Sequence, residues 1–138
     1  MSAKDIFHDV VKKSLEREDW TITDDPLYIK TLGIELFIDL AAEKLIGAEK
    51  EDKKIAVEIK SFVSTSAVSE FHKAVGQFMN YRLALQHQEP DRILLLAIPN
   101  DTYNNFFKLP FIQVAINEYK IGLIVYDPSE EVIVKWLT

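Results

Sequence analysis

The most regular alternation of hydrophobic and polar positions lies between residues 53 and 62. Ile55, Val57 and Ile59 occur at every second position, and Glu58 and Lys60 take the alternate positions. Because successive side chains of a strand point to opposite faces, this pattern predicts a strand with one aliphatic face. The other face carries a carboxylate and an ammonium group. Such charges are unfavourable inside an apolar segment unless they have partners, so the pair is a candidate functional feature.

The segment upstream of this strand begins with a helical pattern. Apolar residues recur at helical spacing, which predicts a helix that starts at a weak cap near Ser2 and ends near Trp20. Residues 21–29 contain two aspartates and a proline, and we interpret them as a turn that leads into a short extended piece. This first helix therefore has one buried stripe and one polar face.

Two further strands are predicted before the central one. The alternation in residues 34–40 indicates a strand that carries Asp39 on one face. Residues 44–50 are interpreted as another strand, and Glu51 and Asp52 as the polar turn into the next one. These strands are expected to pair antiparallel, because the connections between them are short.

The second half of the chain alternates between helices and strongly apolar strands. The pattern of residues 66–88 predicts a long helix that ends before Pro90. Its expected apolar face consists of Val68, Phe71, Val75, Phe78, Met79 and Leu83. The remaining predictions are a central strand at 92–98, helical pieces interrupted at Pro110 within 100–118, a buried strand at 121–126 and an edge strand at 131–136.

This order of elements predicts an α/β fold, with a mixed sheet flanked by helices on both faces. The two buried strands of the second half are joined through helices, so they should form a right-handed parallel crossover. With 138 residues, we expect a single domain that spans 1–138.

Composition narrows the possible functions. The chain has no cysteine, which excludes disulfides and thiolate metal sites, and it has no apolar run long enough to span a membrane. We therefore expect a cytoplasmic protein without membrane contact. The net charge of −6 argues against coating nucleic acid by charge alone. Contact with DNA would need a local basic patch or a partner that supplies one.

The spacing acid-x-Lys is not specific by itself, because it occurs four times in this chain. The four pairs are Glu51/Lys53, Asp52/Lys54, Glu58/Lys60 and Glu118/Lys120. Only Glu58 and Lys60 lie inside an apolar strand, 19 residues after Asp39, which is itself embedded in an apolar strand. The plain alternative is a salt bridge that solvates one face of a sheet.

Asp39 followed by Glu58-Ile59-Lys60 resembles the PD-(D/E)xK signature of nucleases with the restriction-endonuclease-like fold. The resemblance implies a DNA endonuclease that uses Mg²⁺ or Mn²⁺. Asp39, Glu58 and the Ile59 carbonyl would then supply hard oxygen ligands. Lys60 would assist the attacking water and offset charge in the transition state.

A second resemblance extends over nearly the whole chain. The similarity rests on Phe7-His8, Trp20-Thr21-Ile22, IDLAAEKL at 38–45, IAVEIKSF at 55–62, GQFMNYRL at 76–83 and IVYDP at 124–128. These segments are similar to the XisH family, the fdxN element excision controlling factors of cyanobacteria. The resemblance implies a role in programmed DNA excision, with DNA, a site-specific recombinase and a small XisI-like protein as partners. A homo-oligomer is compatible with it.

The long helix carries a further candidate motif. Gln77 and Tyr81 are four residues apart and share a helix face, with Lys73 one turn earlier. They resemble the Gln-x-x-x-Tyr element of RecB-like nucleases, which borders the active site, although such a face can also simply hydrogen-bond to a sheet. His8 and Glu43 are additional candidates, because His8 borders the apolar stripe of the first helix and Glu43 is near Asp39.

Three functions remain open on this basis. The first is a Mg²⁺-dependent endonuclease or nickase, which the intact set of Asp39, Glu58 and Lys60 favours. The second is a catalytically silent accessory factor that acts through DNA, the recombinase or a XisI-like subunit. The third is an interaction scaffold without nucleic acid contact. The acidic net charge favours the second and third.

Overall fold

The structure is a computed structural model that describes residues 4–46, 51–63 and 66–138. Its centre is a six-stranded mixed sheet with the order β1-β4-β5-β6-β7-β8. The strands are β1 (Thr21–Asp24), β4 (Leu40–Ile46), β5 (Glu51–Ile59), β6 (Arg92–Pro99), β7 (Leu123–Asp127) and β8 (Val132–Leu137). The neighbours β5, β6 and β7 run parallel, and the other pairs are antiparallel. The mixed sheet and the parallel crossover are confirmed.

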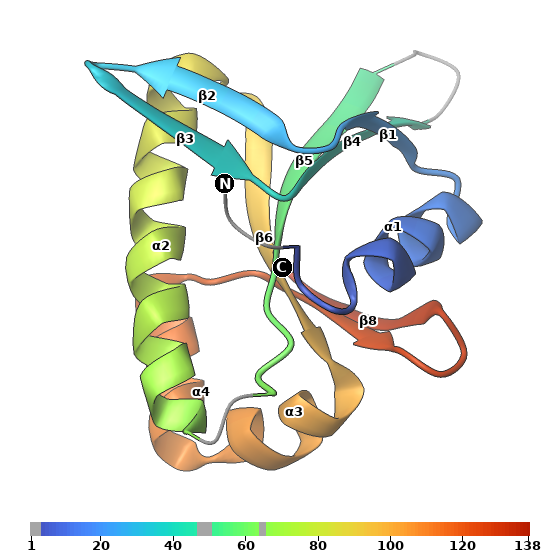
Figure 1. Ribbon diagram of the computed structural model, residues 1–138, viewed down its shortest axis with the longest axis vertical. Helices are drawn as coiled ribbons and strands as arrows, with labels where there is room; N and C mark the ends of the chain where they lie inside the picture. Colours follow the sequence, from blue (N-terminus) through green and yellow to red (C-terminus); the bar gives the residue numbers. More distant parts are fainter. Residues whose placement is uncertain (1–3, 47–50, 64–65) are drawn as a thin grey trace.

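A separate two-stranded sheet is formed by the hairpin of β2 (Leu27–Thr31) and β3 (Ile34–Ile38). Figure 1 shows this hairpin reaching across the upper end of the main sheet towards α2. Its buried residues Leu27, Ile29 and Ile38 join the core on the α2 side. The hairpin therefore extends that core and leads the chain into the turn at Asp39.

Helices cover both faces of the sheet (Figure 1). They are α1 (His8–Arg17), α2 (Ala67–Gln88), α3 (Asn100–Asn105), the 3-10 turn η1 (Phe106–Lys108) and α4 (Pro110–Tyr119). Within β5, Ile55, Val57 and Ile59 pack with the core beneath α1, whereas Ala56 packs with the core beneath α2. The predicted alternation of this strand is confirmed, and it places Glu58 on the α2 side.

Most of the later elements are close to their predicted positions. Ser66 caps α2 by accepting a hydrogen bond from the Ser69 N–H. Pro110 begins α4 after an interruption, as expected for a residue without an N–H. The predicted apolar face of α2 is only partly confirmed, because Val68 and Leu83 are more than half exposed.

The structure corrects several element boundaries in the first half. α1 ends at Arg17, before Trp20, and the predicted cap at Ser2 lies outside the described residues. Residues 21–29 are mostly strand. The strand predicted at 44–50 begins four residues earlier, and residues 47–50 lie outside the described part. Glu51 does not form a turn but starts β5.

In the described part of the chain, no helix combines the length and the apolar composition that crossing a membrane requires.

Candidate functional site

Asp39 and Glu58 are brought together by the register of β4 on β5. Leu40 pairs with Val57, so the residue before Leu40 lies beside the residue after Val57. The Asp39 N–H donates to Oε1 of Glu58 at 3.3 Å, and Oδ2 of Asp39 accepts from the Ile59 N–H at 2.8 Å. These reciprocal bonds hold the two carboxylates side by side, at the bend where β3 ends and β4 begins.

Lys60 joins this pair from the end of β5. Its N–H donates to the carbonyl of Ala97 on β6 at 3.0 Å, which fixes the backbone. Its Nζ lies 3.9 Å from Oε2 of Glu58, and its side chain is 23% exposed. Glu58 itself is only 6% exposed. The predicted acid, acid and lysine set therefore forms one cluster, in which Glu58 is more deeply buried than Lys60.

The electrostatics of this cluster favour a bound proton or another cation. Burial raises the pKa of Glu58 from 4.5 to about 8, and the charge of Asp39 and a side-chain hydrogen bond to it contribute further. Lys60 and the Asp39 N–H act in the opposite direction but only partly offset the rise. Two carboxylates in one desolvated place cannot both ionise without a compensating positive charge.

α2 covers the same place with its polar face. Burial, together with the charges of Glu58 and Asp39, raises the pKa of Tyr81, so the phenol lies within electrostatic reach of both acids. One turn earlier, Oε1 of Gln77 is buried and has no hydrogen-bond partner among the residues described. Lys73 is exposed on the same helix. Tyr81 thus lies near the carboxylates, Gln77 lies one turn before it on α2, and Lys73 is exposed.

The structure does not bring His8 or Glu43 to this cluster. His8 lies on α1, on the opposite face of the sheet, where its Nε2 is 2.7 Å from Oδ1 of Asp25. Glu43 lies further along β4, and its Oε2 forms an ion pair with Arg92 at 3.7 Å. Both additional candidates from the sequence therefore have structural partners elsewhere.

The available metal donors are two side chains and one backbone oxygen. No three His, Cys, Asp or Glu side chains among the described residues come together in a way that could hold a metal ion. The Ile59 N–H points to Asp39. In a strand the N–H and C=O of one residue point to the same side, so the Ile59 carbonyl also faces Asp39. Three hard oxygen donors fit Mg²⁺ or Mn²⁺, which complete their coordination with water or substrate.

Asp5 lies near the site, although the sequence indicates for it no more than the last position of the weak cap that begins at Ser2. Its Oδ1 accepts from the Phe7 N–H and its Oδ2 from the Ser61 N–H, both at 2.9 Å. Asp5 thereby ties the start of the chain to the residue that follows Lys60. A carboxylate just before a helix signals a cap, but nothing in the local sequence indicates a bond to residue 61.

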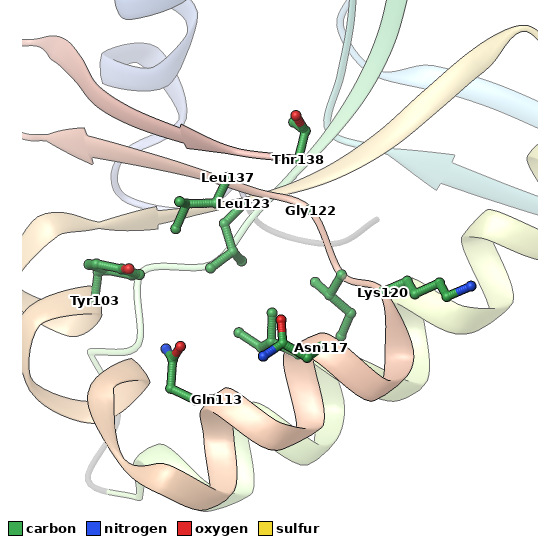
Figure 2. Close-up of a pocket in the computed structure, with 10 residues that line it drawn as sticks. Tyr103, Gln113, Asn117, Lys120, Gly122, Leu123, Leu137 and Thr138 are labelled. Atoms are coloured by element: carbon green, nitrogen blue, oxygen red, sulfur yellow. The ribbon is translucent and has the colours of Figure 1, made fainter.

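A groove of about 560 Å³ lies away from these residues, between α4 and the start of β7 (Figure 2). Its lining includes Tyr103, Gln113, Asn117 and Leu123 but none of the predicted site residues. This groove is therefore separate from the acid cluster.

Fold and site together define a mixed α/β domain with a partly buried acid, acid and lysine cluster at the end of a central strand. The chain belongs to the XisH family, since the family model for the XisH protein matches residues 1–134.

Two solved structures are similar to this chain over almost its entire length. One is an XisH family protein from Nostoc punctiforme PCC 73102, with 47% identity, a TM-score of 0.89, and coverage of 97% of this chain and 100% of that one. The other is a fdxN element excision controlling factor protein from Anabaena variabilis, with 48% identity, a TM-score of 0.89, and coverage of 98% and 100%. A comparison with curated proteins gave no match.

Proposed function

We propose that this protein is an excision controlling factor for a programmed DNA rearrangement, and that it hydrolyses phosphodiester bonds with Mg²⁺ or Mn²⁺. The excision role is supported by family membership and by the name of the Anabaena variabilis relative. The hydrolytic role is supported by the convergence of Asp39, Glu58 and Lys60, with Nζ of Lys60 at 3.9 Å from Glu58. This convergence is the observation that carries the proposal.

Each residue of the cluster has a distinct task in this reaction. Asp39, Glu58 and the Ile59 carbonyl would hold the divalent ion, which when bound polarises a phosphate and lowers the pKa of a water. Glu58 would release its proton when the ion binds, since its raised pKa reflects an excess of negative charge. Lys60, whose side chain is 23% exposed against 8% for that of Glu58, would face the phosphate and stabilise developing charge.

Gln77 and Tyr81 would position the nucleic acid at the edge of the site. The buried Oε1 of Gln77 lacks a partner among described residues, and Tyr81 lies within reach of both acids. An unpaired buried acceptor is unfavourable, so a donor from a ligand or from water is expected there. These two residues would orient the nucleic acid and would take no part in proton transfer.

The second candidate function is a catalytically silent factor that acts through a XisI-like partner or a site-specific recombinase. It is favoured by the 6% exposure of Glu58 and by the net charge of −6, which weakens attraction to free DNA. In that case the cluster would stabilise the junction of β4 and β5, and a partner would supply the affinity for DNA.

Incubation of the protein with supercoiled plasmid tests the proposal. The wild-type protein should convert the plasmid to open-circular or linear DNA only when Mg²⁺ or Mn²⁺ is present. Asp39→Asn and Glu58→Gln should reduce the rate by about 100-fold or more, because each removes charge that holds the ion. Glu16→Gln, which removes one exposed carboxylate of α1, serves as the matched control.

The assay is run with and without a XisI-type subunit to separate the two candidates. Equal cleavage by the wild type and both site variants would refute the catalytic assignment. Absence of cleavage, combined with DNA binding only after the subunit is added, would select the accessory role.

A further inference from the structure

Two lysines from separate elements converge on one aromatic ring outside the acid cluster. Nζ of Lys108 lies 4.6 Å from the centroid of the Tyr103 ring, and Nζ of Lys135 lies 5.1 Å from it. Tyr103 belongs to α3, Lys108 to η1 and Lys135 to β8. Tyr103 is 7% exposed, so its ring is held in place by the core while both lysines are exposed.

This pair of ammonium groups has no acidic partner within the described ranges. Neither lysine takes part in an ion pair there, although other surface lysines do, such as Lys13 with Glu131. Asp101, two residues before Tyr103, does not share its helix face. Glu131, four residues before Lys135, forms its ion pair with Lys13. Two positive charges thus meet at one ring without a compensating carboxylate.

Such an arrangement is suited to bind an anion. Like charges repel each other, and the face of an aromatic ring only partly offsets this through its negative quadrupole. An anionic ligand near the two ammonium groups offsets the repulsion, and each ammonium can donate a charge-assisted hydrogen bond to it. Phosphate groups suit such a site because each offers several oxygen acceptors to ammonium donors.

The surroundings favour a phosphate that belongs to a nucleotide. Figure 2 shows Tyr103 at one end of the groove, with the amide groups of Gln113 and Asn117 directed towards the sheet and the Lys120 ammonium directed away. Nε2 of Gln113 already donates to the Phe107 carbonyl, which leaves its oxygen and the Asn117 amide to match the edges of bases. Tyr103, which both lysines approach, therefore also lines a groove that combines polar amides with apolar walls.

The same region is connected to the acid cluster by packing. Phe62 follows Lys60 by two residues, and its ring contacts that of Phe107 with centroids 5.4 Å apart. Phe107 immediately precedes Lys108. The phosphate-binding candidate and the proposed cleavage site are thus linked through one layer of aromatic side chains.

We propose that Tyr103, Lys108 and Lys135 form a phosphate-binding site for nucleotides, either as units of a DNA strand or as free mononucleotides. In an otherwise acidic protein, this site supplies the local positive charge that contact with DNA requires. Binding at this site does not depend on cleavage by Asp39 and Glu58. Only the choice of DNA over a free nucleotide rests on the proposed function.

Fluorescence anisotropy with a short labelled DNA duplex, in the presence of EDTA, measures binding without cleavage. Compared with wild type, the double variant Lys108→Gln/Lys135→Gln should bind about tenfold more weakly, and the slope of log affinity against log salt should fall by about 1 to 2. The double variant Lys13→Gln/Lys30→Gln removes the same charge from exposed lysines elsewhere and should bind like wild type. Lys108→Arg/Lys135→Arg should retain binding.

Titrations monitored by NMR, with deoxyadenosine monophosphate, deoxyadenosine and inorganic phosphate, distinguish the sources of phosphate. DNA binding that depends on Lys108 and Lys135 assigns the site to a DNA strand. Monophosphate binding with the same dependence but without DNA binding assigns it to free nucleotides. Equal weakening by both double-glutamine variants, equal binding of nucleoside and nucleotide, or no binding of any probe would overturn the proposal. Thermal unfolding of each variant verifies its fold, and none of these outcomes requires nuclease activity.

Discussion

Glu58 carries the largest electrostatic conflict of the described site. It is a carboxyl group held in the interior against a second carboxyl group, and the ammonium group of Lys60 offsets their charge only in part. The folded protein therefore retains a proton on this pair at pH values where an exposed glutamate would have lost it. The same conflict prepares the pair for a divalent ion, which can replace the proton.

This property makes stability depend on pH in a defined direction. Because the pKa of Glu58 rises from 4.5 to about 8 on folding, the folded state binds more protons than the unfolded chain between these values. The free energy of unfolding should therefore fall as pH rises through this window, by on the order of a few kcal/mol. Urea denaturation at a series of pH values measures it.

Glu58→Gln should largely abolish this dependence, since a neutral amide has no proton to lose. Glu16→Gln should keep it, because Glu16 is exposed. The same fall in stability with pH in the Glu58→Gln variant would show that another group is responsible.

At the level of single residues, the sequence was informative where a charge interrupts an apolar pattern. Asp39, Glu58 and Lys60 stand out for this reason, and they converge in the structure. His8 borders an apolar stripe in the same way, yet its position is explained by Asp25 at 2.7 Å. The partner of a buried polar group comes from distant parts of the chain, which local patterns do not specify.

At the level of elements, the hairpin of β2 and β3 depends on an unusual turn. Leu32 has a φ of 49° and Gly33 has a φ of 87°, and two successive positive values are typical of a two-residue type I′ turn. Glycine adopts this conformation readily, whereas leucine does not. The turn was not recognised in the sequence, because Leu-Gly lacks the Asn-Gly signature of such hairpins.

Leu32→Asn should stabilise the protein by about 1 kcal/mol, because asparagine tolerates the left-handed conformation better than leucine. Leu32 is 78% exposed, so little packing is lost. Thermal and urea unfolding measure the change. Val134→Asn also removes an exposed apolar side chain, but from an extended strand, and should give no gain. A loss of stability in Leu32→Asn would contradict this account of the turn.

The boundaries of the elements also show what the sequence pattern could not predict. The alternation at 34–40 is continuous in the sequence, but the structure divides it at Asp39 into β3, which pairs with β2, and β4, which pairs with β1 and β5. Periodicity predicts an extended backbone and does not reveal where the pairing partner changes. That change of partner is what places Asp39 beside Glu58.

At the level of the whole molecule, the order of elements determined most of the architecture. The two apolar strands that are joined through helices form the parallel pair of β6 and β7. The absence of cysteine excludes disulfides and thiolate metal sites, and the net charge of −6 argues against coating nucleic acid by charge alone. The convergence of Lys108 and Lys135 on Tyr103 was not foreseen. It joins three elements that are adjacent only after the sheet has formed.

The central claim is that the folded chain gathers two distant acids into one cation site. Calorimetric titration of Mn²⁺ at a pH above the pKa of Glu58 tests it most directly. The account predicts one bound ion per chain in the wild type and in Glu16→Gln, and loss of that binding in Asp39→Asn and in Glu58→Gln. Binding by both site variants with wild-type affinity, or no binding by the wild type, would contradict it.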